Sequence, residues 1–210
     1  MTTKIKEQIH EVSKKMAYWM LEHEPEQLII DWKSYQRILD EVGVDSSAML
    51  GQYIHQIHHT EGNIESNGLV FIHKTIYEYF LARAIVDIVQ NQLIYPVYPL
   101  EKEMTEQLTK LLNIREIPMQ TLIYLERMIE KCVDSKTQEK KRKCEKYWRR
   151  YFESLLVNGM QYPLSEKNCC NLKIIEKEIT AFLNYLAVVK IILLKLSGKD
   201  RVWLVAESEF

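Results

Sequence analysis

Residues that interrupt regular backbone structure are scarce in this chain. It contains only 6 glycines and 5 prolines in 210 residues, less than half of the roughly 12% that these two residues make up in an average protein. An all-β sandwich or barrel needs many turns, and a glycine-rich nucleotide-binding loop needs several glycines close together. The scarcity argues against both and predicts a mostly helical protein.

Composition and charge exclude further classes of protein. Hydrophobic residues make up 47% and charged residues 27% of the chain, which excludes wholesale disorder. Because 28 Lys and Arg face 29 Asp and Glu, no overall field marks a nucleic-acid-binding protein. The amino terminus is polar, and the most apolar late stretch, residues 181–196, is interrupted by Asn184, Lys190 and Lys195. We therefore expect neither a secretory signal nor a membrane-spanning segment.

Cysteine and histidine patterns give little support for a metal site. The four cysteines form no C-x-x-C pair, and buried thiols in a reduced, cytoplasmic protein are the expectation; they are Cys132, Cys144, Cys169 and Cys170. His55, His58 and His59 have a spacing that places two imidazoles on one helix face. Zinc needs more ligands than such a face offers, so we expect a surface helix here and no metal.

The first half of the chain has the element order of a winged-helix module. Apolar residues spaced by three and four predict helices from Ile5 to before Pro25, over 31–42 and over 48–59. Asp31 is the candidate N-cap of the second helix and Gly43 its break, and Asp45-Ser46-Ser47 is the candidate cap of the third. The turn-rich segment 60–68 and the apolar run 69–72 predict a β-hairpin, and a helical period follows His73.

The second half is predicted to be a helical bundle. Pro96 and Pro99 mark a boundary, which divides the chain into a winged-helix domain, 1–94, and a helical domain, 95–210. Helices are expected over 101–112, 119–133, 135–157 and 172–196, and residues 201–206 are a strand or a frayed tail. The predicted fold is thus mainly α: a winged-helix module with a small β-wing, followed by an α-helical bundle.

The most informative string runs from Phe71 to Arg83. It places His73 where a strand gives way to a helix, and free backbone N–H groups at a helix amino terminus favour an anion. An imidazole N–H would add one more donor for the same phosphate or carboxylate. The plainer alternatives are a capping or buried histidine, and Glu78 by itself is expected to be a solvated charge or a charge in the first turns of the helix.

This string resembles the signature near the end of the winged-helix domain in NACHT-type STAND NTPases, the switch ATPases that include animal NLR proteins and bacterial antiphage sensors. Their pattern is roughly Phe-x-His-x-Ser/Thr-Phe-x-Glu-Tyr/Phe-Phe/Leu-Ala-Ala. The likeness of architecture covers about residues 1–92, and the helical second half resembles the domain that follows in that family. Ile76 replaces the usual aromatic residue, and the matching residues are Phe71, His73, Thr75, Glu78, Tyr79, Phe80 and Ala82.

The resemblance implies a nucleotide-controlled switch. The histidine that His73 matches touches the β-phosphate of ADP in the intact ATPase and holds its closed, inactive arrangement, and exchange for ATP breaks that contact. Glu78, Tyr79 and Phe80 match positions that pack the signature helix. The implied partners are an NTPase domain of the same or a companion chain, which holds ADP or ATP, and further copies on activation. A cytoplasmic role in signal transduction or antiviral defence follows, without a membrane.

The sequence lacks the parts that such an NTPase uses for catalysis. No G-x-x-x-x-G-K-[ST] string occurs, and no apolar strand ends in paired acidic residues that would hold Mg²⁺. The chain alone is therefore expected not to be an enzyme and to hold no cofactor of its own. It is best explained as the carboxy-terminal portion of a longer NTPase.

A basic run forms a second candidate site. Residues 136–150 contain eight basic and two acidic residues, with Tyr147, Trp148 and Tyr151 interleaved or adjacent. The aromatic rings can face inward beneath a solvated helix face, or the run can contact nucleic acid, an acidic protein or a phosphate-bearing ligand. The candidate patch is Lys140, Lys141, Arg142, Lys143, Lys146, Arg149 and Arg150.

Two other functions remain open. One is a free-standing winged-helix nucleic-acid-binding protein that uses the basic helix 136–150, although the predicted third helix, 48–59, contains no Lys or Arg. The other is a helical scaffold that forms oligomers through exposed apolar surface.

Overall fold

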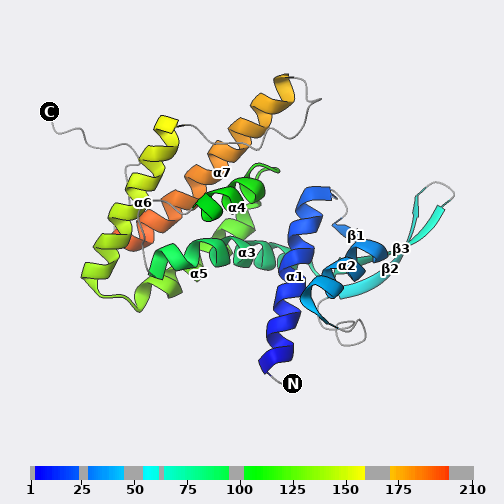
Figure 1. The fold of residues 1–210 in the computed structure, drawn as a ribbon. Helices are drawn as coiled ribbons and strands as arrows, with labels where there is room; N and C mark the ends of the chain where they lie inside the picture. Colours follow the sequence, from blue (N-terminus) through cyan, green and yellow to red (C-terminus); the bar gives the residue numbers. More distant parts are fainter. Residues whose placement is uncertain are drawn as a thin grey trace. The chain divides into compact units, whose positions relative to one another are not determined.

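In the computed structural model the chain is mainly helical with one small antiparallel sheet, as predicted (Figure 1). The structure describes residues 3–23, 28–44, 54–61, 64–94, 102–158 and 171–198. The chain divides into two compact units, Met1–Ala84 and Ile85–Phe210. This division falls inside one helix, α3 (Lys74–Ile94), whereas the sequence places the domain boundary after residue 94, which stays a prediction.

In the first unit, helices pack against a three-stranded sheet. Its elements are α1 (Thr3–His23), β1 (Ile29–Asp31), α2 (Trp32–Val42), β2 (Ile54–Glu61), β3 (Ile64–Phe71) and the beginning of α3. The strand order is β1-β3-β2, and both pairs are antiparallel, with Ile30 opposite Leu69 and Ile57 opposite Gly68. The last strand of the hairpin therefore lies in the middle of the sheet.

The first two helices begin and end where the sequence predicts. Buried residues on α1, among them Val12, Met16 and Met20, follow the three-and-four spacing of one helix face, and the helix ends before Pro25. Asp31 caps α2, because its Oδ1 accepts a hydrogen bond from the Ser34 N–H at 2.9 Å. Gly43 ends α2 in the left-handed conformation with φ 70°, which favours glycine.

The predicted third helix is wrong over its second half. Residues from Ile54 onward form strand β2, and the cap at 45–47 and the start of that helix lie outside the described residues. Ile54 is buried opposite Phe71, so pairing with β3 outweighs the helical spacing of the apolar residues. His55, His58 and His59 therefore lie on a strand, and the argument that two of them share a helix face no longer applies.

The β-hairpin is present but longer than the predicted wing. β2 and β3 pair over their whole length, from Ile54 opposite Phe71 to Glu61 opposite Ile64, so the segment expected to be turn-rich contributes to both strands. Strand β1 was not predicted from the sequence. At three residues, β1 is too short for alternation of apolar and polar side chains to mark it.

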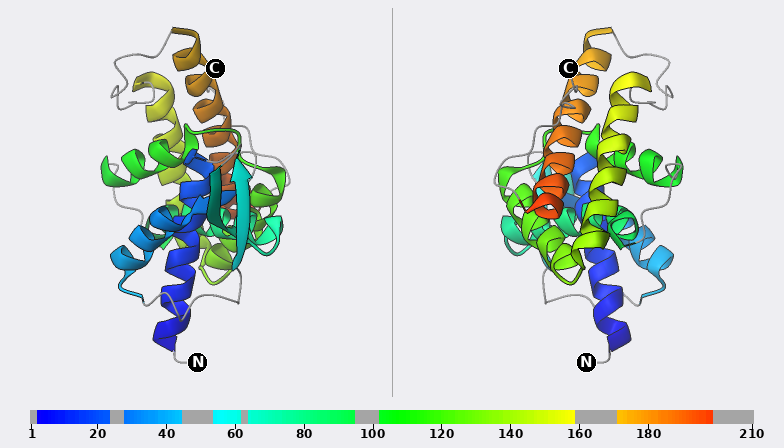
Figure 2. Two further views of the ribbon diagram at one scale, coloured as in Figure 1. Left: turned by 90° about the vertical axis from the view of Figure 1, so that its right-hand side faces the viewer. Right: turned by 90° about the vertical axis from the view of Figure 1, so that its left-hand side faces the viewer.

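The second unit is a bundle built on the last helix. It contains the end of α3, α4 (Lys102–Leu112), α5 (Met119–Asp134), α6 (Gln138–Asn158) and α7 (Asn171–Ser197), so all four helices predicted for this half are confirmed to within a few residues. α7 packs against α4, α5 and α6, and its neighbours are visible from two sides in Figure 2. Residues 201–206 lie outside the described residues.

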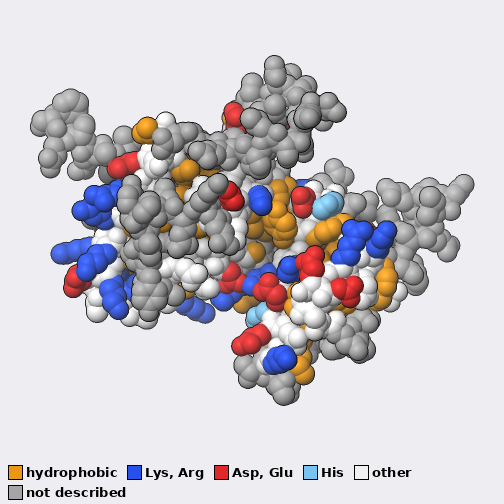
Figure 3. Space-filling view, viewed as in Figure 1, with side chains coloured by type: hydrophobic (Ala, Val, Ile, Leu, Met, Phe, Trp, Pro, Cys, Tyr) orange, Lys and Arg blue, Asp and Glu red, His pale blue; other side chains and the backbone are white. Residues whose placement is uncertain are grey.

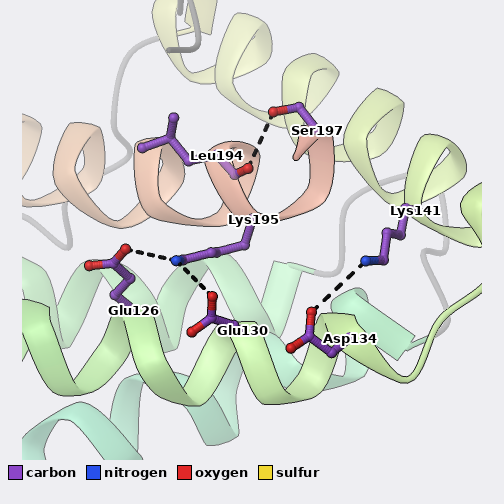
Figure 4. A network of polar contacts seen from close by, with 7 residues as sticks. All are labelled: Glu126, Glu130, Asp134, Lys141, Leu194, Lys195 and Ser197. Carbon is purple, nitrogen blue, oxygen red and sulfur yellow. Dashed lines mark hydrogen bonds and ion pairs between the residues drawn. The ribbon is translucent and has the colours of Figure 1, made fainter. Parts of the chain in front are cut away.

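Polar contacts fix the helices around α7. Asn184 is buried, and its side-chain amide hydrogen-bonds the carbonyl oxygens of Leu112 and Arg115 and the N–H of Ile117. Near the carboxyl end of α7, the Lys195 Nζ lies 2.8 Å from a carboxylate oxygen of Glu126 and 3.1 Å from one of Glu130, both on α5 (Figure 4). These contacts set the positions of α4, α5 and the loop between them relative to α7.

The apolar character of α7 needs one correction. Residues 178–197 are long and apolar enough to cross a membrane by length and composition, contrary to what the charges in 181–196 suggested. However, 44% of that segment is buried within the structure, and Tyr185 lies 2.9 Å from the Thr109 hydroxyl. α7 therefore packs against α4, α5 and α6 along part of its length.

Candidate functional site

His73 lies at the amino terminus of α3, directly after β3. Its carbonyl oxygen accepts a hydrogen bond from the Ile76 N–H at 2.9 Å, and its Nδ1 accepts one from the Thr75 N–H at 3.3 Å. Nδ1 also lies 2.8 Å from the Thr75 hydroxyl oxygen. His73 is therefore the N-cap of α3, which is the capping role weighed from the sequence.

The contact with the Thr75 N–H bears on which ring nitrogen of His73 carries the proton. A ring nitrogen that accepts an N–H is not itself protonated, so the tautomer that fits this contact has its proton on Nε2. The side chain is exposed, and no contact among the described residues engages Nε2. An outward N–H donor thus lies at a helix amino terminus, where the helix dipole also favours an anion.

The other residues of the signature are mostly buried in the first unit. Phe71, Phe80 and Ala82 belong to its core. The rings of Phe71 and Phe80 stack with centroids 6.0 Å apart, and the His10 ring meets Phe80 edge-on at 5.6 Å. These contacts hold the start of α3 against β3 and α1.

The polar signature residues are placed in three different ways. Glu78 is 6% exposed, so of the two alternatives it is a charge in the first turns of α3 and not a solvated one. The Lys74 Nζ, one turn earlier, lies 3.8 Å from its carboxylate. Thr75 is half-buried and contacts His73, whereas Tyr79 is exposed and meets Phe80 edge-on.

The aromatic residues of the basic helix face inward. Tyr147, Trp148 and Tyr151 are buried, and the Trp148 ring meets the other two edge-on at 5.9 and 5.3 Å. Burial raises the pKa of the Tyr151 hydroxyl. The three rings therefore face inward and are not available to stack on bases.

The basic side chains do not form one continuous patch. At about 100° per residue, Lys140 lies roughly 160° around α6 from Arg142. Lys141 is half-buried and faces Asp134 at 4.0 Å (Figure 4). The remaining five are Arg142, Lys143, Lys146, Arg149 and Arg150, and they lie on the side of α6 away from its buried residues.

Some of these cations already have acidic neighbours on the same helix. Lys143 pairs with Glu139 at 2.7 Å, and Arg149 pairs with Glu145 through two nitrogens at 2.9 and 3.2 Å. A shallow hollow of about 340 Å³ lies on this side, and the described residues that line it are Arg142, Glu145, Lys146, Arg149, Arg150 and Glu153. Lys and Arg side chains gather at the edge of the molecule over α6, on the left in Figure 3.

The structure describes two of the four cysteines, Cys132 and Cys144. Cys144 is buried, and its Sγ donates to the carbonyl oxygen of Leu93 at 3.1 Å; burial raises the pKa of this thiol. Cys132 is a half-buried free thiol, and Cys169 and Cys170 lie outside the described residues. Within the described ranges, no three His, Cys, Asp or Glu residues group so as to hold a metal ion.

Comparisons with known proteins add no relative. No protein-family model matches the chain, and neither a curated protein nor a solved structure matches it. The resemblance to NACHT-type NTPases therefore depends on residues 71–83 and on the order of the elements around them.

Proposed function

We propose that this chain is the regulatory and interaction region of a NACHT-like STAND NTPase. In this proposal a winged-helix domain followed by a helical domain responds to the nucleotide held by an NTPase domain of the same or a companion chain. The chain itself catalyses nothing and binds ADP or ATP only together with that domain. A cytoplasmic location, a part in signalling or antiviral defence and oligomer formation on activation belong to the same proposal.

The topology of the first unit supports the winged-helix part. The described elements run helix, strand, helix, hairpin, helix, and the strand order β1-β3-β2 returns the second hairpin strand beside the first strand of the chain. A winged helix would have these elements in this order together with a third helix before the hairpin, and the start predicted for that helix lies outside the described residues. The hairpin β2–β3 then corresponds to the wing.

The observation that carries the switch role is the arrangement of His73. Its Nδ1 is occupied by the Thr75 N–H, so the exposed Nε2–H is the donor left to reach a phosphate oxygen at the amino terminus of α3. A ligand can bias two domain arrangements only through contacts that differ between them. A hydrogen bond from His73 to the terminal phosphate of ADP, made in the closed arrangement alone, would be such a contact.

The test compares two neighbouring substitutions in the assembly with the NTPase domain. His73→Ala removes the donor, whereas Ile72→Ala shortens a neighbouring exposed side chain, 43% exposed, that is assigned no role. A hydrogen bond to a charged group contributes about 1.5–3 kcal/mol, so ADP should dissociate about 10- to 100-fold faster from the His73→Ala assembly. Equal ADP retention in both variants would contradict the proposal.

Two further observations test the proposal without that assembly. The 210-residue chain alone should not hydrolyse ATP above the rate in buffer, and clear turnover would contradict the non-catalytic role. The coding sequence upstream, or a neighbouring reading frame, should encode a phosphate-binding loop of the form G-x-x-x-x-G-K-[ST]. A free-standing winged-helix nucleic-acid-binding protein is the alternative, and it requires no such loop.

A further inference from the structure

We propose that the outer side of α6 binds the phosphate backbone of a nucleic-acid duplex without sequence preference. We call the surface formed by Arg142, Lys146, Arg149 and Arg150 the α6 cationic face. This role goes beyond the proposed switch, because it uses neither His73 nor the first unit.

The spacing of the cations suits an extended polyanion. Arg142, Lys146 and Arg150 follow one another at four-residue intervals, which separates them by about 6 Å along the helix axis. The hollow lined by the four cations of this face also contains Glu145 and Glu153, and Glu145 is engaged by Arg149. Arg side chains can hold a phosphate through two parallel N–H donors.

The polarity of the face favours nucleic acid over a protein partner. Every exposed residue of α6 from Gln138 to Glu153 is polar or charged. Protein interfaces usually contain a buried apolar or aromatic centre, and the exposed apolar side chains of α6, Leu156 and Val157, lie beyond this stretch near its carboxyl end. Binding to a phosphate backbone needs no such centre, because its affinity comes from neutralised phosphates and released counterions.

The burial of the aromatic rings distinguishes a duplex from a single strand. Proteins that bind single strands stack bases on exposed aromatic side chains. Tyr147, Trp148 and Tyr151 lie within the core, so α6 presents charge without a stacking surface. Contacts to phosphates alone carry no sequence information, which is why we expect binding to any duplex.

The experiment measures binding of the full 210-residue chain to a short fluorescent DNA duplex between about 50 and 200 mM salt. Three phosphate contacts predict that the logarithm of the association constant falls with the logarithm of the salt concentration with a slope near −3. The variant Arg142→Glu/Lys146→Glu/Arg150→Glu should lose at least about tenfold in affinity at the lowest salt, and its slope should approach zero.

A control variant matches the change in charge. Lys4, Lys6 and Lys33 are exposed near helix amino termini, where Glu is tolerated, and their replacement by Glu alters the net charge equally. This control and His73→Ala should bind the duplex as the parent chain does. Since His73→Ala is the variant that tests the switch, failure of one proposal is distinguishable from failure of the other.

Four results would overturn the proposal. They are no binding at about 50 mM salt, equal binding by the parent and the α6 variant, equal or tighter binding of polyglutamate, and tighter binding of a single strand than of the duplex. If the Glu variant does not fold by circular dichroism, Arg142→Gln/Lys146→Gln/Arg150→Gln replaces it, with the same loss of affinity expected.

Discussion

The side-chain amide of Asn184 donates a hydrogen bond to the carbonyl oxygen of Leu112, the last residue of α4, at 2.7 Å. The last carbonyl groups of a helix have no partner within the helix itself. α7 therefore supplies from a distant part of the sequence the cap that α4 lacks. The same amide holds Arg115 and Ile117, so one buried side chain orders the whole connection to α5.

Replacement of Asn184 by Ala should destabilise the second unit strongly. The change leaves two carbonyl oxygens and one N–H without their partner, and each such buried group costs about 1–3 kcal/mol. We expect a loss of about 3 kcal/mol or more in the free energy of unfolding, measured by urea denaturation followed by circular dichroism. Ile179→Ala, at an exposed position of the same helix, is the control and should be nearly neutral. A small effect of Asn184→Ala would show that the loop finds other partners.

The charge on Asp31 should make α2 sensitive to acid. Partial burial raises the pKa of this carboxyl, but the hydrogen bonds from Ser34 and from the Lys33 N–H outweigh that effect and bring the pKa below its ordinary value. Because the pKa of Asp31 is lower in the folded than in the unfolded chain, its charged carboxyl stabilises the folded state. This contribution is complete at pH values above the unfolded pKa of about 3.9, and it is lost as the pH falls through the folded pKa.

The test for Asp31 uses Asp31→Asn, which keeps the capping oxygen but does not titrate. The difference in unfolding free energy between the parent and this variant should be constant near pH 6 and shrink below about pH 4. A difference that does not change with pH would contradict the role of the charge. Asp31→Ala should in addition lose the cap itself, about 1 kcal/mol.

Gly43 should resist replacement for reasons of backbone conformation alone. Its φ is 70°, and nothing lies within 4 Å of the position that a Cβ would occupy. Gly43→Ala should therefore cost about 1 kcal/mol through left-handed strain without any clash. Gly43→Asn should cost less, because Asn tolerates this conformation. Equal thermal stability of the Ala variant and the parent would contradict this account of the end of α2.

The ion pairs of Lys195 should weaken only in strong alkali. The hydrogen bond to Glu126 raises the pKa of Lys195 and outweighs the opposing effect of burial, and the bond to Glu130 adds to the increase. Because the pKa of Lys195 is higher in the folded than in the unfolded chain, its ion pairs contribute to the free energy of unfolding. The contribution is complete at pH values below the unfolded pKa of about 10.4, and it is lost as the pH rises through the folded pKa. Lys195→Met should lower stability at pH 7 by about 1 kcal/mol or less.

The control for Lys195 is Lys190→Met, at an exposed position of the same helix. The difference in melting temperature between the Lys195 variant and the parent should hold from neutral pH to about pH 10 and then decrease. If both variants behave alike, the pairs with Glu126 and Glu130 contribute nothing measurable.

The sequence predicted long helices well because their signals are local. Asp31 and Gly43 mark helix ends through their own backbone and capping preferences, and each lies at such an end in the structure. The strand β2 was missed because Ile54 and Ile57 fit a helical spacing equally well. Their pairing with β3 is a contact between distant residues, which no local pattern contains.

The candidate site could be predicted only in part. The position of His73 before a helix follows from the string around it, but the occupation of Nδ1 by the Thr75 N–H depends on the local turn. The positive charge of residues 136–150 could be read from the sequence, but which of these side chains lie on the same side of α6 could not. Asn184 stood out only as a polar residue in an apolar helix, and such a residue is usually hydrogen-bonded when buried.

The continuity of α3 has a consequence for fragment work on this protein. The helix contains neither glycine nor proline, and the two compact units divide between Ala84 and Ile85 in its interior. Limited proteolysis should find no susceptible linker at that division, because a protease needs several residues of backbone that can leave regular structure. A truncation at Ala84 would cut the helix and leave its turns without hydrogen-bond partners. Expression of either unit alone should therefore retain all of α3.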